Sequence, residues 1–175
     1  MSGHNKWSQI KRKKAKTDGA KSKLYSRYSK LISAEAQKVK SDKNAPSLRA
    51  IIDRAKAEDV TNEVIERAIK KGGEPGTSLE SILYEAYGPG GCALIIEALT
   101  TNKNKAAQEV KHILTANGYE LAAIGSAAWA FTREGTAWKP TMTVELSDED
   151  LVLLEKLIDA LDASEEVQEV YTNVE

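Results

Sequence analysis

The chain has 175 residues, of which 41% are hydrophobic and 29% charged, a balance typical of ordinary folded proteins. Its apolar runs are far shorter than the ~20 residues of a membrane-spanning helix, so we expect a cytoplasmic protein with no membrane partner. A single cysteine, Cys92, excludes an internal disulfide. Only His4 and His112 could join Cys92 as soft metal ligands. We therefore expect no metal and no cofactor, and interpret Cys92 as a buried strand residue.

The formal net charge of -1 conceals two parts of opposite sign. Residues 1–75 hold 19 Lys and Arg against 9 Asp and Glu, a net charge of +10. The other 6 basic and 17 acidic residues leave the rest of the chain at -11. The positive excess is concentrated in residues 1–43, with 13 basic and 3 acidic side chains. This asymmetry predicts a basic module that binds a polyanion, joined to an acidic module.

The pattern of apolar residues in the N-terminal part of the sequence predicts helices. Residues 1–19 have no sustained apolar period and are interpreted as a basic arm that can turn helical near its middle. Three amphipathic helices are expected next, at residues 20–40, from Pro46 in a first turn, and after Thr61 as N-cap. Together they predict a small bundle. The Gly- and Pro-rich residues 72–77 predict a linker after it.

Beyond the linker the pattern changes to strands and turns. Strands are expected at residues 82–87, 92–99, 127–132, 141–146 and 167–174, with helices from about Lys103 and from Ser147. Gly88-Pro89-Gly90-Gly91 is interpreted as a hairpin turn. Without the leading hairpin strand the order is β-α-β-β-α-β. The expected fold is α+β: a three-helix bundle with a basic arm over residues 1–75, then a ferredoxin-like (split βαβ) sandwich domain with an extra hairpin strand over 76–175.

The strongest candidate site is a dense cationic cluster near the N-terminus. Clustered cations suit phosphate backbones because each neutralised phosphate releases counterions, and an aromatic ring among them can stack on an unpaired base. One alternative is that the arm only solubilises the protein. A separate alternative for Trp7 is that it packs in the bundle as a core residue. The predicted nucleic-acid contacts are Lys6, Trp7, Lys11, Arg12, Lys13, Lys14, Lys16, Lys21, Lys23 and Arg27.

A second candidate contact lies where a strand is expected to lead into a helix. It consists of Asn102, Lys103, Asn104 and Lys105. Helix N-termini attract phosphates, and asparagines can contact bases or backbone. Asn102 can equally cap the helix, which is the role we favour. No nucleophile, base and acid form a catalytic pattern, so we expect no catalytic residues and no small-molecule substrate.

Several long motifs resemble one known family. They are SGHNKWSQIK at residues 2–11, IERAIK at 65–70, YEAYGPGG at 84–91, LTTNKNK at 99–105, LIDAL at 157–161 and VQEVYTN at 167–173. Together they resemble the YebC/PmpR family over nearly the whole chain. The resemblance implies a regulator of gene expression. Members are commonly described as probable transcriptional regulators with DNA binding. The family also includes the mitochondrial translational activator of cytochrome oxidase, and bacterial relatives are linked to translation of proline-rich stretches on the ribosome.

Two departures limit what the resemblance implies. The family usually carries a further α/β domain between strands ending near Arg133 and beginning near Thr141, and here only a short connection near residues 134–140 is expected. Thr101 and Lys105 stand where the family tends to have an acid and an arginine, so that loop's role does not transfer directly.

The leading hypothesis is a non-enzymatic translation factor on the ribosome that contacts rRNA or tRNA phosphates and aids proline-rich sequences. A DNA-binding transcriptional regulator is the alternative. A protein-interaction adaptor whose arm only solubilises is a third hypothesis. The sequence leaves the oligomeric state open.

Overall fold

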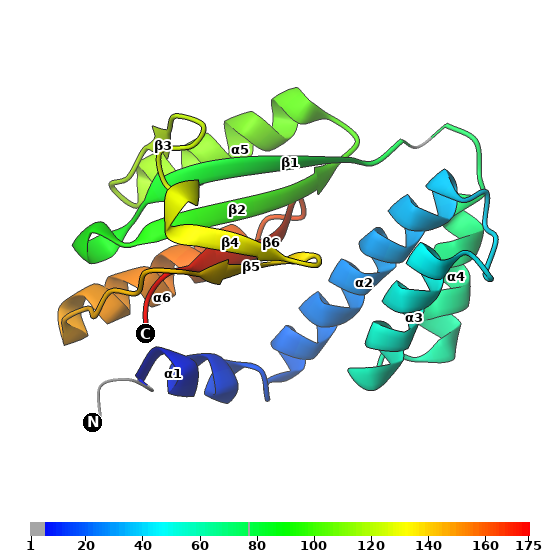
Figure 1. The fold of residues 1–175 in the computed structure, drawn as a ribbon, viewed down its shortest axis with the longest axis horizontal. Coiled ribbons are helices and arrows are strands. Elements are labelled where there is room, and N and C mark those ends of the chain that lie inside the picture. The colour runs from blue at the N-terminus through cyan, green and yellow to red at the C-terminus, as the bar shows by residue number, and fades with distance from the viewer. Residues whose placement is uncertain (1–5, 77) are drawn as a thin grey trace. The chain divides into compact units, whose positions relative to one another are not determined.

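The protein is seen here in a computed structural model that describes residues 6–76 and 78–175 (Figure 1). The described chain forms two compact units. One is Lys14–Glu80, and the other combines the described residues up to Lys13 with Ser81–Glu175. The sequence predicts a boundary near residue 75 with the whole basic arm on the bundle side. The structure instead groups the first part of that arm with the second unit, because Trp7 is buried there.

The helical unit contains α2 (Asp18–Lys38), α3 (Pro46–Ala57) and α4 (Asn62–Gly72), which confirms the predicted three-helix bundle. As predicted, Thr61 is the N-cap of α4: its Oγ1 accepts a hydrogen bond from the Val64 amide at 3.4 Å. Helices α2 and α4 approach each other closely at Gly72: a Cβ at this position would lie 2.5 Å from the Ser33 carbonyl oxygen. Apolar residues from all three helices form the core, among them Tyr28, Ile32, Leu48, Ile51, Ile65 and Ile69.

The second unit is built on a four-stranded sheet of order β3-β1-β2-β6. Its strands are β1 (Glu80–Tyr87), β2 (Ala93–Thr100), β3 (Leu121–Ala122) and β6 (Val167–Thr172). The pairs β1–β3 and β2–β6 are antiparallel. Helices α5 (Lys103–Ala116) and α6 (Asp148–Asp162) cover one face, since their side chains share a core with the sheet. The expected α+β fold, a helical bundle followed by two helices on one sheet face, is confirmed.

The other sheet face is covered by a separate two-stranded hairpin of β4 (Phe131–Glu134) and β5 (Ala137–Pro140). A single helical turn, η3 (Ala128–Ala130), precedes β4 and packs with it on Ala93 and Ile95. The expected strand at 127–132 is therefore this turn and the start of β4, outside the four-stranded sheet.

The strand expected at 141–146 is wrong. In that segment only Val144 forms a bridge, with Val174, while Val144 and Leu146 pack on the main core. The alternation of apolar residues therefore does not mark a paired strand: Val144 and Leu146 pack on the core from an irregular segment, whereas Met142 is 57% exposed. None of the helices in residues 6–76 and 78–175 has the length and apolar character that crossing a membrane requires.

Candidate nucleic-acid interface

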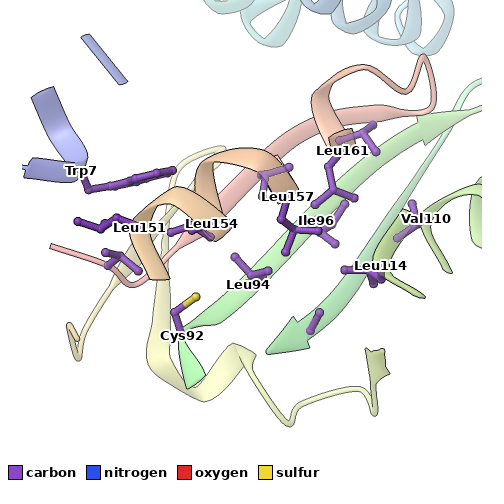
Figure 2. Close-up of a cluster of buried hydrophobic side chains, with 14 residues drawn as sticks. Trp7, Cys92, Leu94, Ile96, Val110, Leu114, Leu151, Leu154, Leu157 and Leu161 are labelled. Carbon is purple, nitrogen blue, oxygen red and sulfur yellow. The ribbon is translucent and has the colours of Figure 1, made fainter. Parts of the chain in front are cut away.

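The first half of the predicted cationic cluster lies on α1 (Lys6–Lys14). Trp7 holds this helix on the α+β unit, because its side chain is 5% exposed within the main core. Figure 2 shows the indole beside Leu151 and Leu154 of α6. Ile10, one turn along α1, is partly buried against the same core. An apolar stripe thus holds the helix and leaves its other side to solvent.

Trp7 is a buried core residue, as the second sequence-based expectation has it, but in the α+β unit and not in the bundle. It neither stands exposed to stack on a base nor packs in the helical bundle. Its core partners come from α6, far downstream in the chain, so no local pattern could reveal them. The signal that could have been used is the spacing of Trp7 and Ile10, which lie three residues apart and so share one helix face.

Three consecutive residues of α1 are cations. Lys11, Arg12 and Lys13, which we call the α1 cation cluster, are all exposed. Within the described residues, no carboxylate forms an ion pair with any of them. Lys6 differs, because its ammonium group forms an ion pair with Asp148 at the start of α6. The α1 cation cluster is thus the part of this helix that is available to external phosphates.

The second half of the predicted cluster belongs to the helical unit. It comprises Lys14, Lys16, Lys21, Lys23 and Arg27. Lys16 and Lys21 are exposed, and the other three are half-buried. The Lys21 ammonium lies 6.0 Å from the centroid of the Tyr25 ring, at the limit of a cation–π contact. The predicted contacts are therefore divided between two units.

The second candidate contact is organised by Asn102. Its Oδ1 accepts a hydrogen bond from the Lys105 amide at 3.1 Å, which confirms the capping role that the sequence favoured. Lys105 Nζ lies 3.1 Å from Glu166 Oε1. That hydrogen bond and charge raise the pKa of Lys105, so its ammonium form is favoured. Lys103 and Asn104 are exposed. A contact of these four residues with nucleic acid stays a prediction.

The cysteine, the described histidine and the serine at the start of α6 have surroundings that indicate structural roles. Cys92 is fully buried directly before β2, and burial raises the pKa of its thiol to about 11. His112 is exposed on α5, while His4 lies outside the described residues. Ser147 caps α6, since its Oγ accepts a hydrogen bond from the Asp150 amide at 3.1 Å. Nowhere in the described ranges do three His, Cys, Asp or Glu side chains gather to hold a metal ion.

One exposed aromatic residue has no role in the sequence-based site. Trp129 is expected in a strand beside Phe131, yet its side chain is 57% exposed. Composition could have drawn attention to this segment, because residues 121–143 contain two of the three tryptophans and a single acidic residue.

Two family matches together span most of the chain. The family described as TACO1/YebC protein N-terminal domain matches residues 5–74. The family described as TACO1/YebC second and third domain matches residues 79–137 and 135–174. The chain belongs to the TACO1/YebC family. The resemblance inferred from the sequence motifs is thereby confirmed.

Relatives of the TACO1/YebC chain carry the name probable transcriptional regulatory protein. The one from Thermoanaerobacter pseudethanolicus is 36% identical over 239 residues, covering 100% of this chain and 97% of the relative. Those from Halothermothrix orenii and Kosmotoga olearia are 41% and 42% identical, covering 95% and 97% of this chain. The chain spans about two thirds of these two relatives, 65% and 66%.

A solved structure has a similar fold. The crystal structure of a conserved hypothetical protein, Aq1575 from Aquifex aeolicus, matches with a TM-score of 0.78 at 28% sequence identity. The match covers 92% of this chain and 93% of that chain.

Proposed function

We propose that the chain is a non-enzymatic, nucleic-acid-binding regulator of gene expression that acts in the cytoplasm on RNA of the translating ribosome. The α1 cation cluster carries this proposal. Its three cations are exposed on a helix that Trp7 fixes to a folded unit. A cation on a fixed helix loses less conformational freedom when it meets a phosphate than a cation on a flexible arm does. The names of the relatives support regulation of gene expression.

The proposed contacts are to phosphates of rRNA or tRNA. Lysine and arginine contacts to phosphates position a protein without reading base sequence, so the target is recognised through its shape. Folded RNA is commonly recognised in this way. Lys16 and Lys21, exposed on the helical unit, extend the same chemistry to a second part of the chain. Assistance to the translation of proline-rich sequences is part of this proposal and rests on the family resemblance.

The second candidate is a DNA-binding transcriptional regulator. The names of the relatives favour it, because each describes transcriptional regulation. Sequence-selective binding that survives competitor DNA at moderate salt would support this candidate over the first. Steeply salt-dependent binding without sequence preference would contradict it.

We also propose that this chain lacks a domain present in longer relatives. The second family match is divided into two pieces that meet at residues 135–137. The alignment with the Thermoanaerobacter relative spans 239 positions, whereas this chain has 175 residues. At this point β4 and β5 are joined by a tight turn, in which Gly135 has a φ of 61°. The regulator would then act without that inserted domain.

Ribosome co-sedimentation of matched charge-reversal variants tests the proposal. K11E/K13E reverses two cations of the α1 cation cluster, and K111E/K156E reverses two exposed lysines on α5 and α6. We expect wild type and K111E/K156E to sediment with translating ribosomes at low salt, and K11E/K13E to stay in the supernatant. The slope of log affinity against log salt should be shallower by about 2 in K11E/K13E. Wild type that stays in the supernatant, or identical behaviour of both variants, would overturn the proposal.

A further inference from the structure

An acid-poor stretch interrupts the otherwise acidic α+β unit. Residues 121–143 contain one acidic residue, Glu134, against Arg133 and Lys139. Glu134 is neutralised locally, because Lys139 Nζ lies 2.5 Å from its Oε2. The rest of residues 81–175 holds 15 acidic and 4 basic side chains. The net charge along residues 121–143 is therefore +1, against -11 for the rest of residues 81–175, so this stretch repels a polyanion less than the remainder of the unit does.

Trp129 is the exposed aromatic residue of this stretch. It lies in η3, immediately before β4, and its side chain is 57% exposed. Its Nε1 donates a hydrogen bond to the Tyr87 hydroxyl at 3.1 Å, and that hydroxyl donates to the Ser126 carbonyl. Tyr87 is itself 38% exposed. We call these two side chains the Trp129 surface. Because the indole N–H is already bonded, Trp129 offers its ring to a ligand and not a hydrogen-bond donor.

The backbone around the Trp129 surface is fixed by one buried carboxylate. Glu85 is 8% exposed and accepts three backbone hydrogen bonds. Its donors are the amides of Gly125, Ala127 and Ala128, at 2.6, 3.0 and 2.6 Å. Ala127 and Ala130 pack on the sheet below. An aromatic ring on such a support loses little conformational entropy when a ligand stacks on it.

We propose that the Trp129 surface is a stacking site for an unpaired nucleobase. Every base has a π-face, so stacking on tryptophan binds single strands with little sequence preference. Arg133, on the β4–β5 hairpin that follows in the chain, is a candidate cation for a flanking phosphate; the hairpin itself is seen in Figure 1. There the Arg133 guanidinium lies 5.1 Å from the centroid of Trp138, an arrangement that keeps the exposed arginine in place. The inference rests on the proposed nucleic-acid binding and adds a second contact to the α1 cation cluster.

The decisive experiment compares two strands of equal length and charge. Oligothymidylate carries bases, whereas an abasic strand of the same length offers only phosphates. We expect Trp129→Leu to weaken oligothymidylate binding about fivefold or more and to leave binding of the abasic strand unchanged. Trp129→Phe should retain most of the affinity because it keeps an aromatic face. Leu153→Ala, which truncates an exposed apolar side chain on α6, is the matched control and should change neither affinity.

Tryptophan emission gives a second measurement that does not depend on the leucine variant. Oligothymidylate should quench the emission of the wild type, and Trp129→Phe should remove that quenching, while the abasic strand should have no effect. Quenching that persists in Trp129→Phe, or that the abasic strand also produces, would overturn the inference.

The variants also separate this inference from the proposed function. K11E/K13E should weaken binding of both strands, because both carry phosphates. If K11E/K13E weakens binding and Trp129→Leu has no effect, the stacking site is wrong, the proposed function stands, and the Trp129 surface is free for a protein partner. If Trp129→Leu weakens both strands equally, the ring does not meet a base and the inference is also wrong. If the wild type binds neither strand nor ribosomes, the proposed function fails.

Discussion

Two tryptophans of the same compact unit lie in opposite environments. Trp7, surrounded in sequence by lysines, is 5% exposed in the main core. Trp129, in a run of alanines before Phe131, is 57% exposed. Composition near each residue therefore suggests the reverse of what the structure shows. The exposure of each tryptophan depends on its contact partners: Trp7 meets leucines of α6, whereas the indole N–H of Trp129 is bonded to Tyr87. The first tryptophan positions cations, and the second is a candidate contact.

The largest expected effect comes from removing the buried indole. Trp7→Ala should lower the free energy of unfolding of the α+β unit by about 3 kcal/mol, the lower end of the range for a buried aromatic. The lower end applies because α1 contributes only Trp7 and the partly buried Ile10 to this core. Urea unfolding measures the loss, and hydrogen exchange of the α1 amides should approach that of an unfolded chain.

Trp129→Leu is the matched control for that experiment. Because Trp129 is mostly exposed, its replacement should lower the free energy of unfolding by less than about 1 kcal/mol. Equal losses in the two variants would contradict the contrast between a core tryptophan and a surface tryptophan.

The support of the Trp129 surface gives the next largest effect. Glu85→Ala leaves the amides of Gly125, Ala127 and Ala128 without their acceptor, and the Ala127 amide is buried, so we expect a loss of about 2 kcal/mol in unfolding free energy. Thermal unfolding measures it, with Glu149→Ala on the exposed start of α6 as the control. Hydrogen exchange at the three amides should accelerate. Unchanged exchange there would show that Glu85 does not fix this loop.

The helical unit could be predicted from local sequence, and the α+β unit only in part. Pro46 and Thr61 mark helix starts within a few residues of the apolar stripes that they precede, so the bundle follows from neighbouring positions. The pairing of β2 with β6 joins residues such as Ile95 and Tyr171, which no local pattern connects. The alternation around Val144 fits a paired strand, yet the segment forms one bridge and otherwise packs irregularly on the core, an outcome that depends on long-range contacts.

The candidate site likewise has features that follow from local sequence and features that depend on long-range packing. The exposure of Lys11, Arg12 and Lys13 follows from their charge and could be predicted. The packing of Trp7 on the α+β unit instead of in the bundle could not, because its partners lie on α6. The assignment of the two halves of the cationic cluster to different units likewise depends on that packing.

Asn102, at the start of α5, is a third residue that either stabilises the fold or contacts nucleic acid, and the change in stability expected from its substitution is smaller. Asn102→Ala removes the N-cap and should lower the free energy of unfolding by about 1 kcal/mol. Asn104→Ala, within the first turn of α5, should have almost no effect on stability. Thermal unfolding measures both, and filter binding of RNA measures affinity. A loss of affinity in Asn102→Ala without a loss of stability would show that this side chain contacts nucleic acid and that its cap is dispensable.

The ion pair between Lys6 and Asp148 should have the smallest effect. Its side chains are 50% and 78% exposed, so water and salt screen their attraction. A double-mutant cycle of Lys6→Ala and Asp148→Asn should give a coupling free energy below about 1 kcal/mol that vanishes at high salt. Phosphate binding by the α1 cation cluster also weakens at high salt. Burial of Trp7 does not weaken at high salt, so the α1 amides should stay protected from hydrogen exchange at a salt concentration that releases the nucleic acid. Loss of that protection together with binding would mean that charge, and not the indole, holds α1 in place.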